Sequence, residues 1–170
     1  PSINNMSATV CSGNSFTVTP VNTTNGIVPA GTSYSWTAPV VAGITGTADG
    51  NNAANISGTL TNNTNATISV AYIVTPSAGG CPGDTFTVTV TVNPTPAVNN
   101  FTTTICSGAA FLITPVNGTD GVIPAGTTYS WPSPNVPEIT GEAAGTNLTS
   151  IGNTLTNTTD SVVTVVYTVT

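Results

Sequence analysis

The stretch Thr85-Phe86-Thr87-Val88-Thr89-Val90-Thr91-Val92 alternates strictly between threonine and an apolar residue. Side chains of a β-strand point alternately to its two faces, so Phe and Val line one face and Thr lines the other. One apolar and one hydroxyl-bearing face are typical of a sheet that packs a single face on a core. The stretch therefore predicts a half-buried strand of an antiparallel β protein.

The same alternation recurs earlier in the chain. Residues 66–75 place Ile68, Val70, Tyr72 and Val74 on one face. Tyr34-Ser35-Trp36 puts two aromatic side chains on one face, and we expect this segment to fill the core. Further short strands are expected at Met6 to Cys11, around Phe16 and Val18, and at Ile56 to Leu60. Six or seven short strands separated by Gly, Pro and Asn clusters predict an immunoglobulin-like β-sandwich.

A repeat of 95 residues organises the whole chain. Shifted by 95 positions, residues 1–75 align with residues 96–170 without a gap, and about half of the aligned residues are identical. A repeat of this length fits an independently folding sandwich domain. We therefore predict two domains, residues 1–94 and 95–170, joined by a stiff spacer at Asn93-Pro94-Thr95-Pro96.

The second domain is predicted to lack its last strand. The counterpart of residues 76–94, which contain the Thr/Val stretch, would follow Thr170. Two explanations stay open. Either the 170 residues are a window of a longer repetitive polypeptide, or a strand from a neighbouring molecule completes the second domain.

Charged side chains are almost absent. The chain has 6 Asp and Glu, no Lys, Arg or His and a net charge of −6, while 36 Thr and 19 Asn supply polarity. Without cations it cannot neutralise nucleic-acid phosphates or dock on an anionic membrane, and no apolar run is long enough for membrane insertion. Without His or Lys it lacks the base of a Ser or Cys triad. We predict no enzyme, no catalytic residue, no metal and no cofactor.

Several segments together resemble a known family. They are Cys11-Ser12-Gly13, Pro29-Ala30-Gly31-Thr32-Ser33-Tyr34-Ser35-Trp36, Gly80-Cys81-Pro82-Gly83-Asp84 and the Thr-Val-Thr-Val-Thr-Val-Asn-Pro run that ends at Pro94. They resemble the PKD-like repeats of very large Bacteroidetes cell-surface proteins, such as SprB-like gliding-motility adhesins exported by the type IX secretion system. The resemblance implies all-β, tandem immunoglobulin-like (PKD-like) β-sandwich domains in an extracellular stalk or adhesive filament at the cell surface.

Three cysteines suggest disulfide bonding in a protein outside the cell. Cys11 and Cys81 lie in the first repeat, and we predict a disulfide between them. The alternative is two buried free thiols. Cys106 is the counterpart of Cys11, and its predicted partner lies beyond the fragment.

Few other residues point to a site. Asp49-Gly50-Asn51-Asn52 has the composition of a calcium loop, but Ala144-Gly145-Thr146-Asn147 stands at that place in the second repeat, which favours a solvated turn. Paired carboxylates are typical of glycosidases, but Glu138 and Glu142 have Gly43 and Thr47 as counterparts and no pocket-forming insertion around them, so we expect no such chemistry. Asp160-Ser161-Val162 is similar to an O-glycosylation motif of Bacteroidetes, which makes Ser161 a candidate acceptor.

Together these features predict a structural and adhesive repeat region of an extracellular filament. Its expected partners are neighbouring repeats of the same polypeptide, with surface polysaccharide or other filament strands, and no nucleic acid. One alternative is a carbohydrate-binding module in which exposed Trp36 and Trp131 stack on sugar rings. Another is a fibre subunit completed by donor-strand exchange, because strands without Lys lack the commonest protection against edge pairing.

Overall fold

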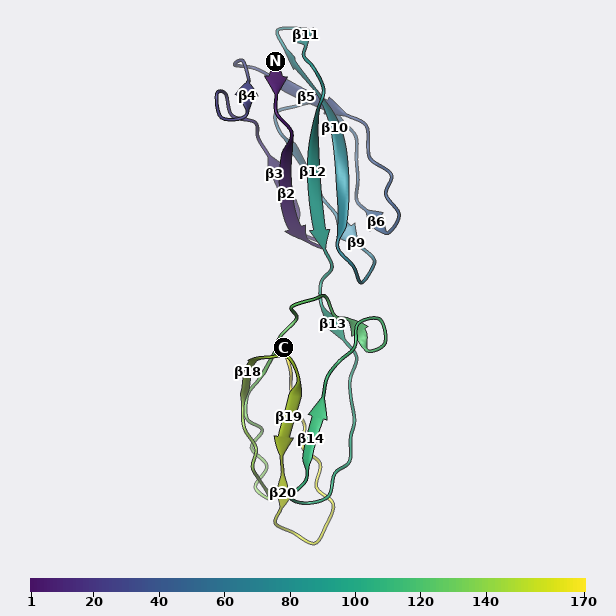
Figure 1. Ribbon diagram of the computed structural model, residues 1–170, viewed down its shortest axis with the longest axis vertical. Helices are drawn as coiled ribbons and strands as arrows, with labels where there is room; N and C mark the ends of the chain where they lie inside the picture. The colour runs from purple at the N-terminus through teal and green to yellow at the C-terminus, as the bar shows by residue number, and fades with distance from the viewer. The chain divides into compact units, whose positions relative to one another are not determined.

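The computed structural model describes residues 1–170, which form β-strands and no helix. Contacts between residues divide the chain into two compact units, Pro1–Thr95 and Pro96–Thr170 (Figure 1). The strands of the first unit are β1 (Ser2–Ile3), β2 (Met6–Cys11), β3 (Ser15–Val18), β4 (Gly26–Ile27), β5 (Ser33–Trp36), β6 (Ile44–Thr45), β7 (Gly50–Ala53), β8 (Ile56–Thr59), β9 (Thr61–Asn62), β10 (Ile68–Ala78), β11 (Cys81–Pro82) and β12 (Phe86–Asn93). Those of the second unit are β13 (Ala97–Val98), β14 (Ala110–Ile113), β15 (Gly121–Val122), β16 (Tyr129–Trp131), β17 (Ile139–Thr140), β18 (Gly145–Leu148), β19 (Ile151–Thr154) and β20 (Thr156–Asn157).

The predicted Thr/Val strand is β12, and it lies inside the main sheet of the first unit. The order of that sheet is β2-β12-β10-β5-β7, with β11 paired to the end of β10. β12 is antiparallel to β10 but parallel to β2, so Met6 lies beside Val88 and Cys11 beside Asn93. The first and last long strands of the unit therefore lie side by side and point the same way (Figure 1).

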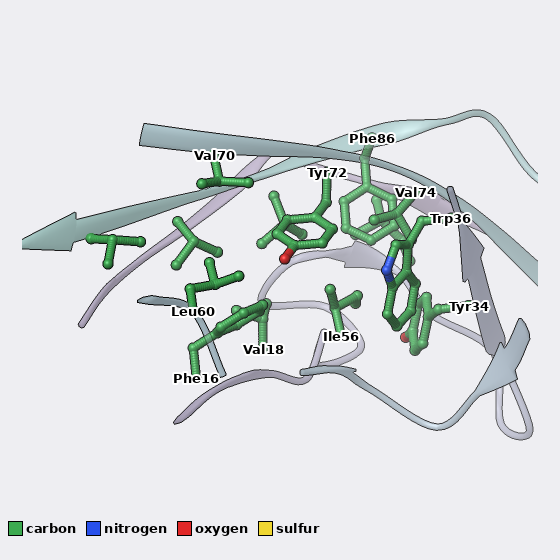
Figure 2. Packing of buried hydrophobic residues seen from close by; sticks show 14 residues of the cluster. Phe16, Val18, Tyr34, Trp36, Ile56, Leu60, Val70, Tyr72, Val74 and Phe86 are labelled. Carbon is green, nitrogen blue, oxygen red and sulfur yellow. The ribbon is translucent and has the colours of Figure 1, made fainter. Parts of the chain in front are cut away.

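A second layer covers the apolar face of this sheet. β3 pairs with β8, and Phe16, Val18 and Ile56 from these strands meet the side chains that β10 and β12 present (Figure 2). Val88, Val90 and Val92 are fully buried, as the alternation in β12 predicts. The all-β, immunoglobulin-like sandwich predicted from the sequence is confirmed.

The second unit repeats the first except around the absent last strand. β13 to β20 lie 95 positions after β1, β3 and β4 to β9, within one residue. Residues 101–106 and 163–170, the counterparts of β2 and β10, form no strand ladder. Both β2 and β10 pair with β12, and the second unit has no β12. Without that shared partner the alternating sequence at 163–169 stays extended but unpaired along one edge, because a strand ladder requires a neighbour.

Candidate functional site

The thiols of Cys11 and Cys81 lie at opposite ends of the first unit. Cys11 ends β2 beside Asn93, the last residue of β12. Cys81 pairs with Ala78 and precedes Phe86, the first residue of β12, so it lies at the other end of that strand. β12 has 8 residues, which separates its two ends by about 23 Å. A disulfide needs a Cα separation of about 4.4 to 6.8 Å. This geometry overturns the predicted Cys11–Cys81 disulfide, and both thiols are free.

The parallel pairing of β2 and β12 is the physical reason for this correction. Between antiparallel neighbours the end of the first strand would lie near the start of the last, where Cys81 precedes β12. Between parallel neighbours it lies near the end of the last strand instead. The alternative of buried free thiols also fails, because Cys11, Cys81 and Cys106 are all exposed. A partner for Cys106 beyond Thr170 stays a prediction.

Both tryptophans are interior side chains. Trp36 is 9% exposed and Trp131 is 4% exposed. Each indole N–H donates to a carbonyl within its own unit, from Trp36 Nε1 to Ala48 O at 2.9 Å and from Trp131 Nε1 to Ala143 O at 3.0 Å. Burial of the indole faces leaves neither residue available to stack on a sugar ring, so the structure does not support them as a carbohydrate platform.

The aromatic core is built in the same way in both units. Tyr72 meets Phe16 with ring centroids 5.6 Å apart and Trp36 at 6.3 Å. Tyr167 meets Phe111 at 5.4 Å and Trp131 at 6.4 Å. Edge-to-face and tilted contacts of this kind add to the stabilisation that burial gives.

Burial also raises the pKa of the tyrosine hydroxyls. The pKa values of Tyr34 and Tyr72 lie above the ordinary 10.0 because the ionised form would lose its hydration. The pKa of Tyr129 is raised by burial and then by the charge of Asp120. For Tyr167 burial raises the pKa, a hydrogen bond from Asn153 lowers it and the charge of Glu142 raises it. These hydroxyls stay neutral well above physiological pH.

Three of the acidic side chains accept hydrogen bonds from backbone amides. Asp49 Oδ1 accepts from the amide of Ala38 at 2.7 Å, and Asp120 Oδ2 accepts from the amide of Val116 at 2.8 Å. Asn25, the counterpart of Asp120, accepts through Oδ1 from the amide of Val21 at 2.9 Å. Because both side chains make this bond, Asn and Asp can replace each other before Gly26 and Gly121. Glu142 accepts from Val136 at 3.2 Å. No three Cys, Asp or Glu side chains gather as a metal site would require.

The hydroxyl of Ser161 lies on an exposed turn. The backbone carbonyl of Ser161 accepts from Asn157 Nδ2 at 2.7 Å, and its backbone amide donates to Thr159 Oγ1 at 3.3 Å. The hydroxyl itself donates a hydrogen bond to Asp160 Oδ1 at 3.4 Å. An exposed hydroxyl on an ordered turn is accessible to a modifying enzyme, and glycosylation of Ser161 stays a prediction.

An open depression lies over β5, β7 and β10. Ser35, Trp36, Thr37, Gly50, Ile73 and Thr75 line it. Its lining holds three hydroxyl side chains and the buried Trp36, but no Asp, Glu, Cys or Tyr. It offers no group for acid–base chemistry.

Asn62 is a structural residue that sequence reasoning missed. It is the one buried polar side chain of the chain, 7% exposed. Its Nδ2 donates to Ala66 O at 2.8 Å and to Val92 O at 2.9 Å, and its Oδ1 accepts from the amide and hydroxyl of Thr64. It thereby joins β9 and the loop between β9 and β10 to the end of β12. The sequence did carry a signal for this role. The pair Asn62 and Thr64 recurs in the second repeat as Asn157 and Thr159.

The two tandem β units agree with a comparison with protein-family models. A model of the PKD-like domain family matches residues 8–96 and 103–170. The chain belongs to the PKD-like domain family. The PKD-like domains are generally non-catalytic modules and typically lie outside the cell. A search of curated proteins found no match to the chain. No segment of the structure is a helix with the length and apolar character of a membrane span.

Proposed function

We propose that this PKD-like chain is a non-enzymatic structural and adhesive repeat region that carries tension in an extracellular stalk or filament at the cell surface. The role extends to a gliding-motility adhesin exported by a type IX secretion system, as the resemblance of its repeats to SprB-like proteins suggests. Neighbouring repeats of the same polypeptide are its proposed partners, with surface polysaccharide or other filament strands on its outside.

The parallel pairing of β2 and β12 carries the proposal. Because the two strands point the same way, tension on the two ends of the unit pulls them in opposite directions along their length. All six aligned residue pairs, from Met6–Val88 to Cys11–Asn93, then resist in shear together. In an antiparallel terminal pair the bonds would instead open one after another. A stalk module needs backbone hydrogen bonds that bear the load at the same time.

The absence of charge supports the same role. The first unit is held by a continuous apolar core and backbone ladders. Neither depends strongly on salt or on pH near neutrality, because neither rests on ion pairs. A module outside the cell, where ionic conditions change, benefits from this independence.

Single-molecule pulling of the 170-residue chain tests the proposal. The first unit should unfold at a high force and release up to about 340 Å of chain, estimated at 3.6 Å per residue for 95 residues. The second unit is the built-in control. It lacks the counterpart of β12, so it should unfold at a clearly lower force and release up to about 270 Å. Equal, low forces for both units would contradict a tension-bearing role.

A further inference from the structure

Each unit has one Asn-Gly pair in the loop that leads to its second short strand. Asn25-Gly26 lies at the start of β4, and Asn117-Gly118 lies shortly before β15. In an Asn-Gly pair the backbone nitrogen of glycine can attack the side-chain amide of asparagine, because glycine has no side chain to hinder the attack. The two pairs share this sequence, so the hydrogen bonds around them decide which one reacts.

The attacking nitrogen of the first pair has no hydrogen-bond partner. β1 and β4 are antiparallel, with Ile3 opposite Gly26. In the neighbouring pair the amide of Asn4 donates to the carbonyl of Asn25 at 2.9 Å. Bonded and non-bonded pairs alternate between antiparallel strands, so Ile3 and Gly26 are a non-bonded pair. The amide of Gly26 therefore points away from β1 and is available to react.

The attacking nitrogen of the second pair is held. The amide of Gly118 donates to the carbonyl of Gly121 at 2.9 Å. This bond must break before the nitrogen can reach the side chain of Asn117, which slows the reaction by about fivefold. Asn117 is exposed while Asn25 is half-buried, so exposure alone would predict the opposite order.

The side chain of Asn25 is also held in place for attack. Its Oδ1 accepts from the amide of Val21 at 2.9 Å. This donor stabilises the negative charge that develops on the oxygen as the nitrogen adds to Cγ. Asn117 Oδ1 has a similar donor, the amide of Ile123 at 2.8 Å, so this effect does not separate the two pairs.

The turn requires the glycine that makes Asn25 reactive. Gly26 has a φ of 110°, and a Cβ there would collide with the carbonyl oxygen of Ser2. Gly121, its counterpart, has a φ of 124° and follows Asp120. The second unit thus already carries the aspartate that the reaction would produce in the first.

We propose that Asn25 is a self-modification site, at which the chain converts this asparagine to aspartate and isoaspartate. Hydroxide removes the amide proton of Gly26, and the nitrogen attacks Cγ of Asn25. The N–Cγ bond forms, the Cγ–Nδ2 bond breaks, and the side-chain nitrogen takes a proton from water and leaves as ammonia. Water then opens the succinimide ring, at Cγ to give aspartate or at the backbone carbonyl to give isoaspartate. This inference goes beyond the proposed mechanical role and does not rest on it.

The two products affect the turn differently. Aspartate keeps the acceptor for the Val21 amide, as Asp120 does for Val116 at 2.8 Å, and it adds one negative charge to the chain. Isoaspartate lengthens the backbone before Gly26 by a methylene group, which displaces Gly26 from its place opposite Ile3. The reaction therefore leaves one population with an intact β1–β4 pair and one in which this pair is weakened.

Incubation of the 170-residue chain at mildly alkaline pH tests the site. Peptide mapping by mass spectrometry follows each asparagine, and ion-exchange chromatography follows the added charge. In the native chain Asn25 should convert about fivefold faster than Asn117, the factor that the Gly118 hydrogen bond supplies. In concentrated urea these hydrogen bonds are lost, so the two residues should convert at similar rates. Both rates should rise with pH, because hydroxide removes the amide proton.

Two variants serve as controls. Asn25→Gln places the amide one methylene group further away, so the conversion at this position should stop. Asn25→Asp carries the product from the start, and it should elute with the converted chain and keep the melting temperature of the parent.

The order of the two rates decides the outcome. Faster conversion of Asn25 in the native chain, with similar rates in urea, supports the site. Equal native rates, or faster conversion of the more exposed Asn117, would overturn it. So would a native chain in which neither residue converts while both convert in urea, because the fold would then protect Gly26. A low unfolding force in the pulling experiment leaves these measurements untouched.

Discussion

The six-membered ring of the Trp36 indole lies directly against the backbone of Gly50, across the pair β5–β7. A Cβ on Gly50 would lie 2.4 Å from three carbons of that ring, and Gly145 stands in the same relation to Trp131. β5 and β7 pair with a register shift between Tyr34 and Trp36, which brings the glycine under the indole. Glycine is retained at this place in both repeats because no side chain fits between backbone and ring.

Replacing this glycine should destabilise the first unit without changing its fold. Gly50→Ala forces the Trp36 ring out of its position, and overpacking of this kind costs about 1–3 kcal/mol. Chemical denaturation followed by far-UV circular dichroism measures the loss, since this signal does not depend on Trp36. The double variant Gly50→Ala with Trp36→Phe is the control, since the smaller ring makes room for the methyl group. A Gly50→Ala variant as stable as the parent would show that the indole moves freely.

The three thiols should react without unfolding of the protein. Cys11, Cys81 and Cys106 are exposed and free, so Ellman's reagent should titrate three thiols per native chain. A reductant should leave the melting temperature unchanged, because it has no bond to cut. Protein isolated from an oxidising compartment should be tested beside protein made in a reducing one. A single reactive thiol together with a fall in melting temperature on reduction would restore the rejected disulfide.

Stability should stay flat through neutral pH and fall in alkali. Burial raises the pKa values of Tyr34, Tyr72, Tyr129 and Tyr167 above the unfolded value of 10.0. The unfolded chain therefore releases these protons first. The contribution of the neutral, buried hydroxyls to the free energy of unfolding is fully present below pH 10 and is lost as the pH rises through the folded-state pKa values. Denaturation measured between pH 7 and 12 checks this.

The matched variant for this experiment is Tyr72→Phe, which keeps the ring contacts and removes one titrating hydroxyl. Its alkaline loss of stability should be smaller than that of the parent. A free energy of unfolding that increased above pH 10 would contradict the role given to burial.

Asn62 should matter more than its counterpart in the second unit. Asn62→Ala removes four hydrogen bonds, one of them to the buried carbonyl of Val92, at a cost of about 2–3 kcal/mol. Asn157→Ala removes the turn bonds alone, and it should cost about 1 kcal/mol. Thermal melts of both variants beside the parent chain measure the difference. Equal losses would mean that the bond to β12 contributes nothing.

The sequence by itself determined the layers and the repeat. Strict alternation in β12 and β10 specifies which side chains are buried, because side chains of a strand point alternately to its two faces. The gapless shift of 95 placed β13 to β20 on their counterparts in the first unit. Trp36 was correctly expected in the core, since it lies on an alternating aromatic segment.

The tertiary structure alone decided what depends on strand direction and on neighbours. Alternation is the same in a parallel and an antiparallel strand, so the sequence could not show that β2 runs parallel to β12, and the expected disulfide failed for that reason. The role of Asn62 was equally hidden, because the Val92 carbonyl that it bonds lies 30 positions away in the chain. Residues 163–170 carry the pattern of β10 yet form no ladder, because a strand exists only where another backbone pairs with it.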